Sequence, residues 1–138
     1  MSRVNVRSTR KGKYVEVLRQ YEKEGRAAVA YGVNTIRNFA IEGITSGNKS
    51  GATYTRRGVQ HRASAAGEYP ASDTGNLVSN IYIELDADGL GGQVESRAQY
   101  SSYLEFGTSK MAERPFMFPS AERARPLIRQ RFRRMKAR

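Results

Sequence analysis

Apolar residues recur at helical spacing through the first third of the chain, from Tyr14 to Ile44. Charged side chains such as Glu16 and Arg19 occupy the opposite face, so the pattern predicts one amphipathic helix about 45 Å long. Two glycines lie on the apolar stripe, where close backbone packing is the favoured explanation and a kink or break is the alternative. The stripe comprises Val15, Leu18, Tyr21, Gly25, Ala28, Val29, Gly32, Val33, Ile36, Phe39 and Ala40.

The segment from residue 45 to 72 is different, because Gly, Ser, Thr, Asn and Arg dominate it. Two short runs, Tyr54–Arg57 and Gln60–Arg62, flank Gly58 and predict a small hairpin. A connection this long is usually functional or disordered. We interpret residues 45–72, called the arm below, as a flexible segment that orders against a partner, with simple disorder as the alternative.

Short elements are predicted after the arm. Thr74–Ser79 predicts a helix capped by Ser72 or Asp73. The alternation over Ile81–Leu85 predicts a half-buried strand, and Gln93–Arg97 pairs back with it across an Asp- and Gly-rich turn.

The last quarter of the chain is predicted to end in a helix. Residues 98–106 predict a short helix that Gly107 ends in a left-handed conformation. Arg114–Phe118 is expected to be extended, with Phe116 and Phe118 on one face. Pro119 suits the first turn of the final helix, and Pro126 is expected to bend or restart it. The sum is a single α+β domain over residues 1–138, with a long N-terminal helix packed on a small antiparallel β-sheet, short helices and a C-terminal helix.

Positive charge gathers at both ends of the chain, which carries a formal net charge of +11. Such a balance favours phosphate or acidic protein surfaces, and such binding weakens with salt. A solvated helix face with a frayed end is the alternative reading. The expected DNA-facing residues lie in the basic C-terminal tail, residues 129–138: Arg129, Arg131, Arg133, Arg134, Lys136 and Arg138.

Catalytic and metal-binding patterns are weak in this sequence. The single histidine, His61, has no partner motif, and the turn with Asp86 and Asp88 lacks the other ligands of a calcium loop. The chain has no cysteine, no apolar run of about 20 residues and no apolar leader near its start. We expect a soluble intracellular protein without enzymatic activity, metal or cofactor.

Large apolar side chains concentrate in the segment Tyr100–Pro119, which reads YSSYLEFGTSKMAERPFMFP. In a chain so rich in charge, these side chains are expected to supply much of the core. Glu105 and Arg114 in this segment are expected to form a pair that fixes its turn, with two unrelated surface charges as the alternative.

Two blocks of the sequence are similar to those of a known family. His61–Leu77 and Tyr100–Pro119 resemble the conserved blocks of the neck and tail-completion proteins (head–tail joining, minor tail components) of long-tailed bacteriophages and prophages. The resemblance spans about residues 14–127, while Ala66 and Tyr69 stand where the family often has proline. The second block matches at Tyr103, Glu105, Phe106, Gly107, Thr108, Lys110, Met111, Arg114, Pro115, Phe116 and Pro119.

The resemblance implies a virion structural protein of the head–tail junction, assembled in the host cytoplasm. Such subunits form rings, typically hexameric, and meet a head-side connector or stopper protein, the tail tube protein and the packaged DNA. A small non-specific DNA-binding protein that uses its basic termini is the alternative. The residues expected to hold the domain, the base of the arm and the adjoining interface are Asp73, Thr74, Gly75, Leu77, Tyr103, Glu105, Phe106, Gly107, Arg114, Pro115 and Phe116.

Overall fold

The computed structural model describes residues 11–46, 49–72 and 75–135. The α+β class is confirmed, although the strands form two separate antiparallel hairpins and not one sheet. The elements in chain order are α1 (Lys11–Thr45), β1 (Thr53–Arg56), β2 (Val59–Arg62), α2 (Asn76–Ser79), β3 (Ile81–Leu85), β4 (Gly92–Ser96), α3 (Ser101–Phe106) and α4 (Met117–Arg133).

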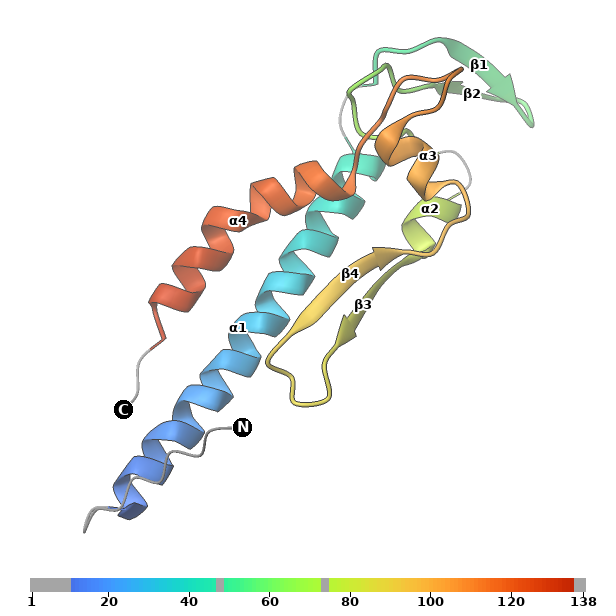
Figure 1. Cartoon of the computed structure of the whole chain (residues 1–138). Coiled ribbons are helices and arrows are strands. Elements are labelled where there is room, and N and C mark those ends of the chain that lie inside the picture. Colours follow the sequence, from blue (N-terminus) through green and yellow to red (C-terminus); the bar gives the residue numbers. More distant parts are fainter. Residues whose placement is uncertain (1–10, 47–48, 73–74, 136–138) are drawn as a thin grey trace.

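Helix α1 is the spine of the molecule (Figure 1). Its 35 residues make a rod about 52 Å long at the usual helical rise. Helix α4 packs beside its C-terminal half and runs back along it, while the β3–β4 hairpin packs on another side. The β1–β2 hairpin and α3 lie near the C-terminal end of α1 (Figure 1). The other elements therefore cover only part of α1.

The two glycines of the apolar stripe lie where neighbouring side chains pack closely against α1. A Cβ on Gly25 would lie 3.2 Å from Cδ2 of Leu90, and one on Gly32 would lie 3.5 Å from Ile128 of α4. The helix continues unbroken through both positions. The expectation of close packing is therefore confirmed, and the alternative of a break is wrong.

The hydrophobic core is small and lies at the C-terminal end of α1. Phe116, Ile44 and Ile81 are the largest apolar side chains that are fully buried. Leu77 of α2 belongs to the same cluster, and the partly buried Leu104 of α3 packs against it. The first turns of the apolar stripe stay outside it: Val15, Leu18 and Tyr21 are exposed, with Leu18 at 62%.

Both predicted hairpins are present, although the two arm strands each begin one residue earlier than predicted and Arg57 lies in the turn between them. In the arm, Tyr54 pairs with His61 and Arg56 with Val59. In the second hairpin, Leu85 pairs with Gly92, so β4 begins one residue earlier than the sequence predicted. Ile81 and Ile83 lie on the face toward α1, and Ile81 is buried.

Two helix starts differ from the prediction. Helix α2 begins at Asn76, and its N-cap is Gly75 with a φ of 77° and no side-chain hydrogen bond. Ser72 therefore does not cap α2, and that part of the prediction is wrong. Asp73, the other predicted cap, and Thr74, the predicted first residue, lie outside the described residues.

Helix α4 begins at Met117, two residues before Pro119, and continues through Pro126. The predicted extended segment ending at Phe118 is therefore wrong. As a consequence Phe116 and Phe118 do not share a face: Phe116 is buried and Phe118 is 67% exposed. Pro119 does lie in the first helical turn, as expected.

Within the described parts of the chain, no helix is both long and apolar enough to span a bilayer.

Candidate assembly surface

Glu105 of α3 caps helix α4 from outside. Its Oε1 accepts hydrogen bonds from the backbone N–H groups of Phe116 (3.2 Å) and Met117 (2.9 Å), and its Oε2 accepts one from Phe118 (3.3 Å). These amides open α4 and have no partner within the helix, and the helix dipole favours a negative charge there. These three capping bonds explain why α4 begins two residues before Pro119.

Arg114 contacts the arm and not Glu105. Its Nε donates to the carbonyl oxygen of Ser64 (3.1 Å) and its guanidinium to that of Ala112 (3.2 Å), while its backbone N–H bonds Leu104 of α3 (2.6 Å). The predicted Glu105–Arg114 pair is therefore wrong. Each side chain instead satisfies backbone groups, and half-buried Pro115 lies between Arg114 and the buried Phe116.

Replacing Glu105 with alanine is expected to lower the free energy of unfolding by about 1–3 kcal/mol, because the first backbone amides of α4, two of them in part-buried hydrogen bonds, lose their acceptor. Thermal and urea unfolding followed by circular dichroism measure this change. Glu113→Ala, an exposed glutamate in the following loop, is the matched control. Equal stability of the two variants would contradict the capping role.

Gly107 allows the chain to turn between α3 and the following loop. Its φ is 76° and its ψ 177°, a combination that only glycine adopts readily. A Cβ there would also lie 3.0 Å from the backbone nitrogen of Glu113 and the carbonyl oxygen of Met111. The positive φ is as predicted, although the ψ is extended and not left-handed helical.

The aromatic side chains of this segment mostly face solvent. Tyr103 and Phe106 of α3 are 57% and 79% exposed, and Phe118 of α4 is 67% exposed. We call Tyr103, Phe106 and Phe118 the signature aromatics. The expectation that they form the core is wrong: of the phenylalanines and tyrosines in this segment, Phe116 alone is buried. Because α3 has six residues, it offers one face to the core, and Leu104 occupies it.

The base of the arm is fastened to the domain by Tyr69. Its hydroxyl lies 3.0 Å from Ser120 Oγ of α4, and its ring covers Gly43 so closely that a Cβ at that position would overlap the ring. The Lys49 ammonium lies 5.9 Å from the ring centroid. Tyr69 therefore anchors the arm to both long helices.

Glu68 links the two chain segments at the base of the arm. Its carboxylate accepts hydrogen bonds from the hydroxyl of Ser50, from the backbone N–H of Ser50 (3.1 Å) and from that of Ala65 (2.8 Å). The Ser50 hydroxyl bond and these backbone bonds lower the pKa of Glu68 to about 2.

The hydrogen bonds of Glu68 are expected to weaken in acid. The depressed pKa means that the stabilisation is fully present above the ordinary value of 4.5 and is lost as the pH falls toward about 2. The amide chemical shifts of Ser50 and Ala65, followed by NMR, are expected to titrate with a midpoint near the lower value. Glu68→Gln removes this titration, and a midpoint at the ordinary value would contradict the assignment.

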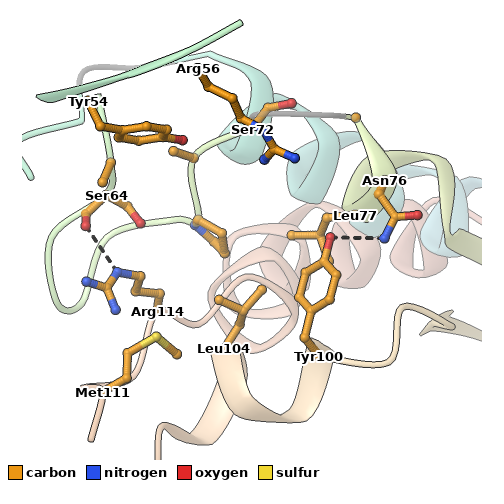
Figure 2. Close-up of a pocket in the computed structure, with 14 residues that line it drawn as sticks. Tyr54, Arg56, Ser64, Ser72, Asn76, Leu77, Tyr100, Leu104, Met111 and Arg114 are labelled. Atoms are coloured by element: carbon orange, nitrogen blue, oxygen red, sulfur yellow. Dashed lines mark hydrogen bonds between the residues drawn. The ribbon is translucent and has the colours of Figure 1, made fainter. Parts of the chain in front are cut away.

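A cleft of about 570 Å³ opens between the base of the arm, α2 and α3. Figure 2 shows Arg114 bonded to Ser64 at one end and Asn76 bonded to the Tyr100 hydroxyl (3.2 Å) at the other. Gly75, Leu77 and Leu104 are among the residues that line it. The residues described include no group of three or more His, Asp or Glu side chains that could hold a metal ion.

The basic C-terminal residues continue a helix. Arg129, Arg131 and Arg133 belong to α4, and Arg134 follows it as C-cap. Of these four, Arg129, Arg133 and Arg134 are exposed and Arg131 is half-buried. Lys136 and Arg138 lie outside the described residues.

A small α+β chain that turns large aromatic side chains toward solvent has the character of a subunit that assembles with other proteins. Residues 11–107 match the family described as "Bacteriophage HK97-gp10, putative tail-component", and the chain belongs to this family. The family resemblance predicted from the sequence is confirmed, and the chain is a component of the phage tail, located in the virion among other virion proteins. Searches of curated proteins and of solved structures found no match.

The family match covers the whole of the first block, His61–Leu77, and part of the second block, Tyr100–Pro119. It includes the arm, both hairpins and α3 up to Gly107, while Arg114–Phe116 and α4 lie beyond it. The bonds from Glu105 to α4 therefore join the matched part of the chain to the remainder. Sequence reasoning missed this link because it depends on a contact between two helices, although the acidic residue before the Gly107 turn was visible.

Proposed function

We propose that this chain is a structural ring subunit of the phage head–tail junction, a tail terminator or neck ring protein, which joins the tail to the DNA-filled head without catalysing a reaction. The observation that carries the proposal is the exposure of the signature aromatics in a member of a phage tail family. Aromatic side chains are enriched in protein interfaces, so several large exposed rings in one segment support an assembly role.

The energetics favour assembly. Burying apolar surface yields roughly 25 cal/mol per Å², and the two most exposed aromatics, Phe106 and Phe118, keep most of their surface in solvent in the single chain. The small core leaves further apolar area open along the first turns of α1. Contacts between unlike surfaces of successive copies close into a ring when the rotation permits. A hexamer, with a head-side connector or stopper on one face and the tail tube protein on the other, is the proposed arrangement.

Electron microscopy of the particle tests this proposal directly. Antibody or gold labelling of an affinity-tagged chain is expected at the junction of head and tail. Phages lacking the chain are expected to accumulate unjoined heads and tails. Label along the tail shaft or at the distal tip, with normal joining in the deletion, would contradict the junction role.

The exposed arginines at the end of α4 favour a second candidate, non-specific DNA binding. Arg129 and Arg133 lie one helical turn apart, so their guanidinium groups share a face of α4. Met135 packs against α1, since its Cε would lie 3.8 Å from a Cβ at Gly25. Substituting the arginines is therefore a cleaner test than deleting residues 129–138, which would also remove this contact. Changing Arg129, Arg131, Arg133 and Arg134 to glutamine separates the candidates. Loss of DNA retention with normal tail joining would favour DNA binding, and loss of neither would make these residues a solvated helix end.

A further inference from the structure

Charge is segregated between the two hairpins. Residues 81–96, which contain β3 and β4, carry four acidic residues and no Lys or Arg, in a chain with a formal net charge of +11. Residues 49–67, which contain β1 and β2, carry Lys and Arg and no acid. The acidic members are Glu84, Asp86, Asp88 and Glu95, and the basic members are Lys49, Arg56, Arg57 and Arg62.

The acidic side chains lie on the solvent side of the β3–β4 hairpin. Tyr82 pairs with Glu95 and Glu84 with Gln93, so these four side chains share the face that points away from α1. Asp86 and Asp88 continue the charge into the turn, where both are exposed. We call this surface the acidic face.

The acidic face already binds one guanidinium group. Arg97 of the same chain places its Cζ 4.1 Å from the ring centroid of Tyr82 and its Nε 2.7 Å from Glu95 Oε1. Aromatic rings and carboxylates together are the usual environment of an arginine. Asp86 and Asp88 extend the negative charge from Glu84 into the turn.

The arm hairpin presents matching groups. Arg57 lies at its tip with a φ of 51°, and Arg62 is exposed near its base. Val59 is an exposed apolar residue between them. The hairpin has two strands, so both of its edges leave backbone N–H and C=O groups for a further partner. An isolated two-stranded hairpin is marginally stable, which favours a partner of this kind.

The arm of one chain does not lie beside its own acidic face. The turn of the β3–β4 hairpin packs at Gly25 and Arg26, whereas the base of the arm packs at Gly43. These positions are about 27 Å apart along α1 at 1.5 Å per residue. Figure 1 shows the arm hairpin projecting from one end of α1 and the β3–β4 turn pointing toward the other.

We propose that the arm hairpin of each subunit docks on the acidic face of the next copy, with Arg57 and Arg62 opposite Glu84 and Asp86. This inference rests on the proposed ring and names its contact. Because the two surfaces differ, the contact is head-to-tail, and each subunit gives one and receives one. Association through it weakens with salt, since the pairs are exposed.

A charge-exchange experiment on the full chain tests the contact. Arg57→Glu with Arg62→Glu places acidic side chains opposite Glu84 and Asp86, and Glu84→Lys with Asp86→Lys places basic side chains opposite Arg57 and Arg62. Each variant alone is expected to associate at least about tenfold more weakly than the unchanged chain in analytical ultracentrifugation at low salt. An equal mixture is expected to regain association, since each arm then meets an opposite charge. Circular dichroism confirms that the variants fold.

Cross-linking gives a second readout, because the chain has no cysteine of its own. Gln60→Cys in the arm and Gln93→Cys on the acidic face are made in separate chains, mixed and oxidised. A disulfide dimer of the two unlike variants is expected. Gln130→Cys on α4, mixed with Gln60→Cys, is the matched control and is expected to give little product.

The outcomes separate this contact from the ring itself. An oligomer that survives both charge reversals and gives no arm-to-face cross-link would overturn the contact and leave the ring standing. Absence of any oligomer, in solution at low salt and in cross-linked particles, would overturn both. If reversing the arm charges reduces DNA retention and leaves association unchanged, the arm binds DNA and the contact is again overturned.

Discussion

Replacing Phe116 with alanine is expected to lower the free energy of unfolding by about 3–5 kcal/mol. The Phe116 ring is fully buried and lies in the cluster with Ile44, Leu77 and Ile81, so truncation leaves a cavity at the junction of α1, α2 and β3. Small domains have about 5–15 kcal/mol of stability in total. The loss is therefore a large part of what holds this domain, and urea unfolding measures it.

Phe118→Ala is the matched control for this prediction. Phe118 is the same residue type two positions later, but it is 67% exposed. Its truncation is expected to change the free energy of unfolding by no more than about 0.5 kcal/mol. If both variants lose the same stability, the core does not lie where the structure places it.

Replacing Phe106 with serine is expected to abolish tail joining and to leave the fold intact. The ring is 79% exposed at the end of α3, so its removal takes little from the core. At an interface, truncating a central aromatic typically costs 2 kcal/mol or more, which corresponds to roughly a 30-fold loss of affinity. Complementation of a deletion phage, with joined and unjoined particles counted by electron microscopy, measures the effect.

Ser102→Ala, an exposed position on the same short helix, is the control for this experiment and is expected to complement fully. Thermal unfolding of the Phe106 variant is expected to match that of the unchanged chain. Normal joining by a stable Phe106→Ser protein would remove this residue from the assembly surface. A strongly destabilised variant would instead show that the Phe106 side chain supports the fold.

The long helix and both hairpins could be predicted from the sequence, because their signals are local. A periodic apolar stripe specifies α1, and alternation around Gly58 and around the Asp- and Gly-rich turn specifies the hairpins. Gly25 and Gly32 were correctly assigned to close packing. The helix and hairpin predictions succeeded since each depends on residues that are near one another in the chain.

The errors concern contacts between distant segments. The start of α4 was placed too late because its cap, Glu105, belongs to another helix. The same contact leaves Arg114 to bond the arm. Aromatic residues were assigned to the core from their chemistry alone, although a six-residue helix such as α3 has room for one buried face. Composition shows which side chains prefer burial but not whether a single chain can provide it.

The β1–β2 hairpin of the arm begins and ends at one point of the molecule. Gly51 donates its backbone N–H to the carbonyl of Ala63, and Ala63 donates to that of Ala52, so the hairpin between them leaves and returns through one pair of neighbouring strands. Insertions or deletions confined to residues 53–62 therefore leave the rest of the domain in place. Related phages can evolve arms of different length on the same domain, and with them different reach, without redesigning the core.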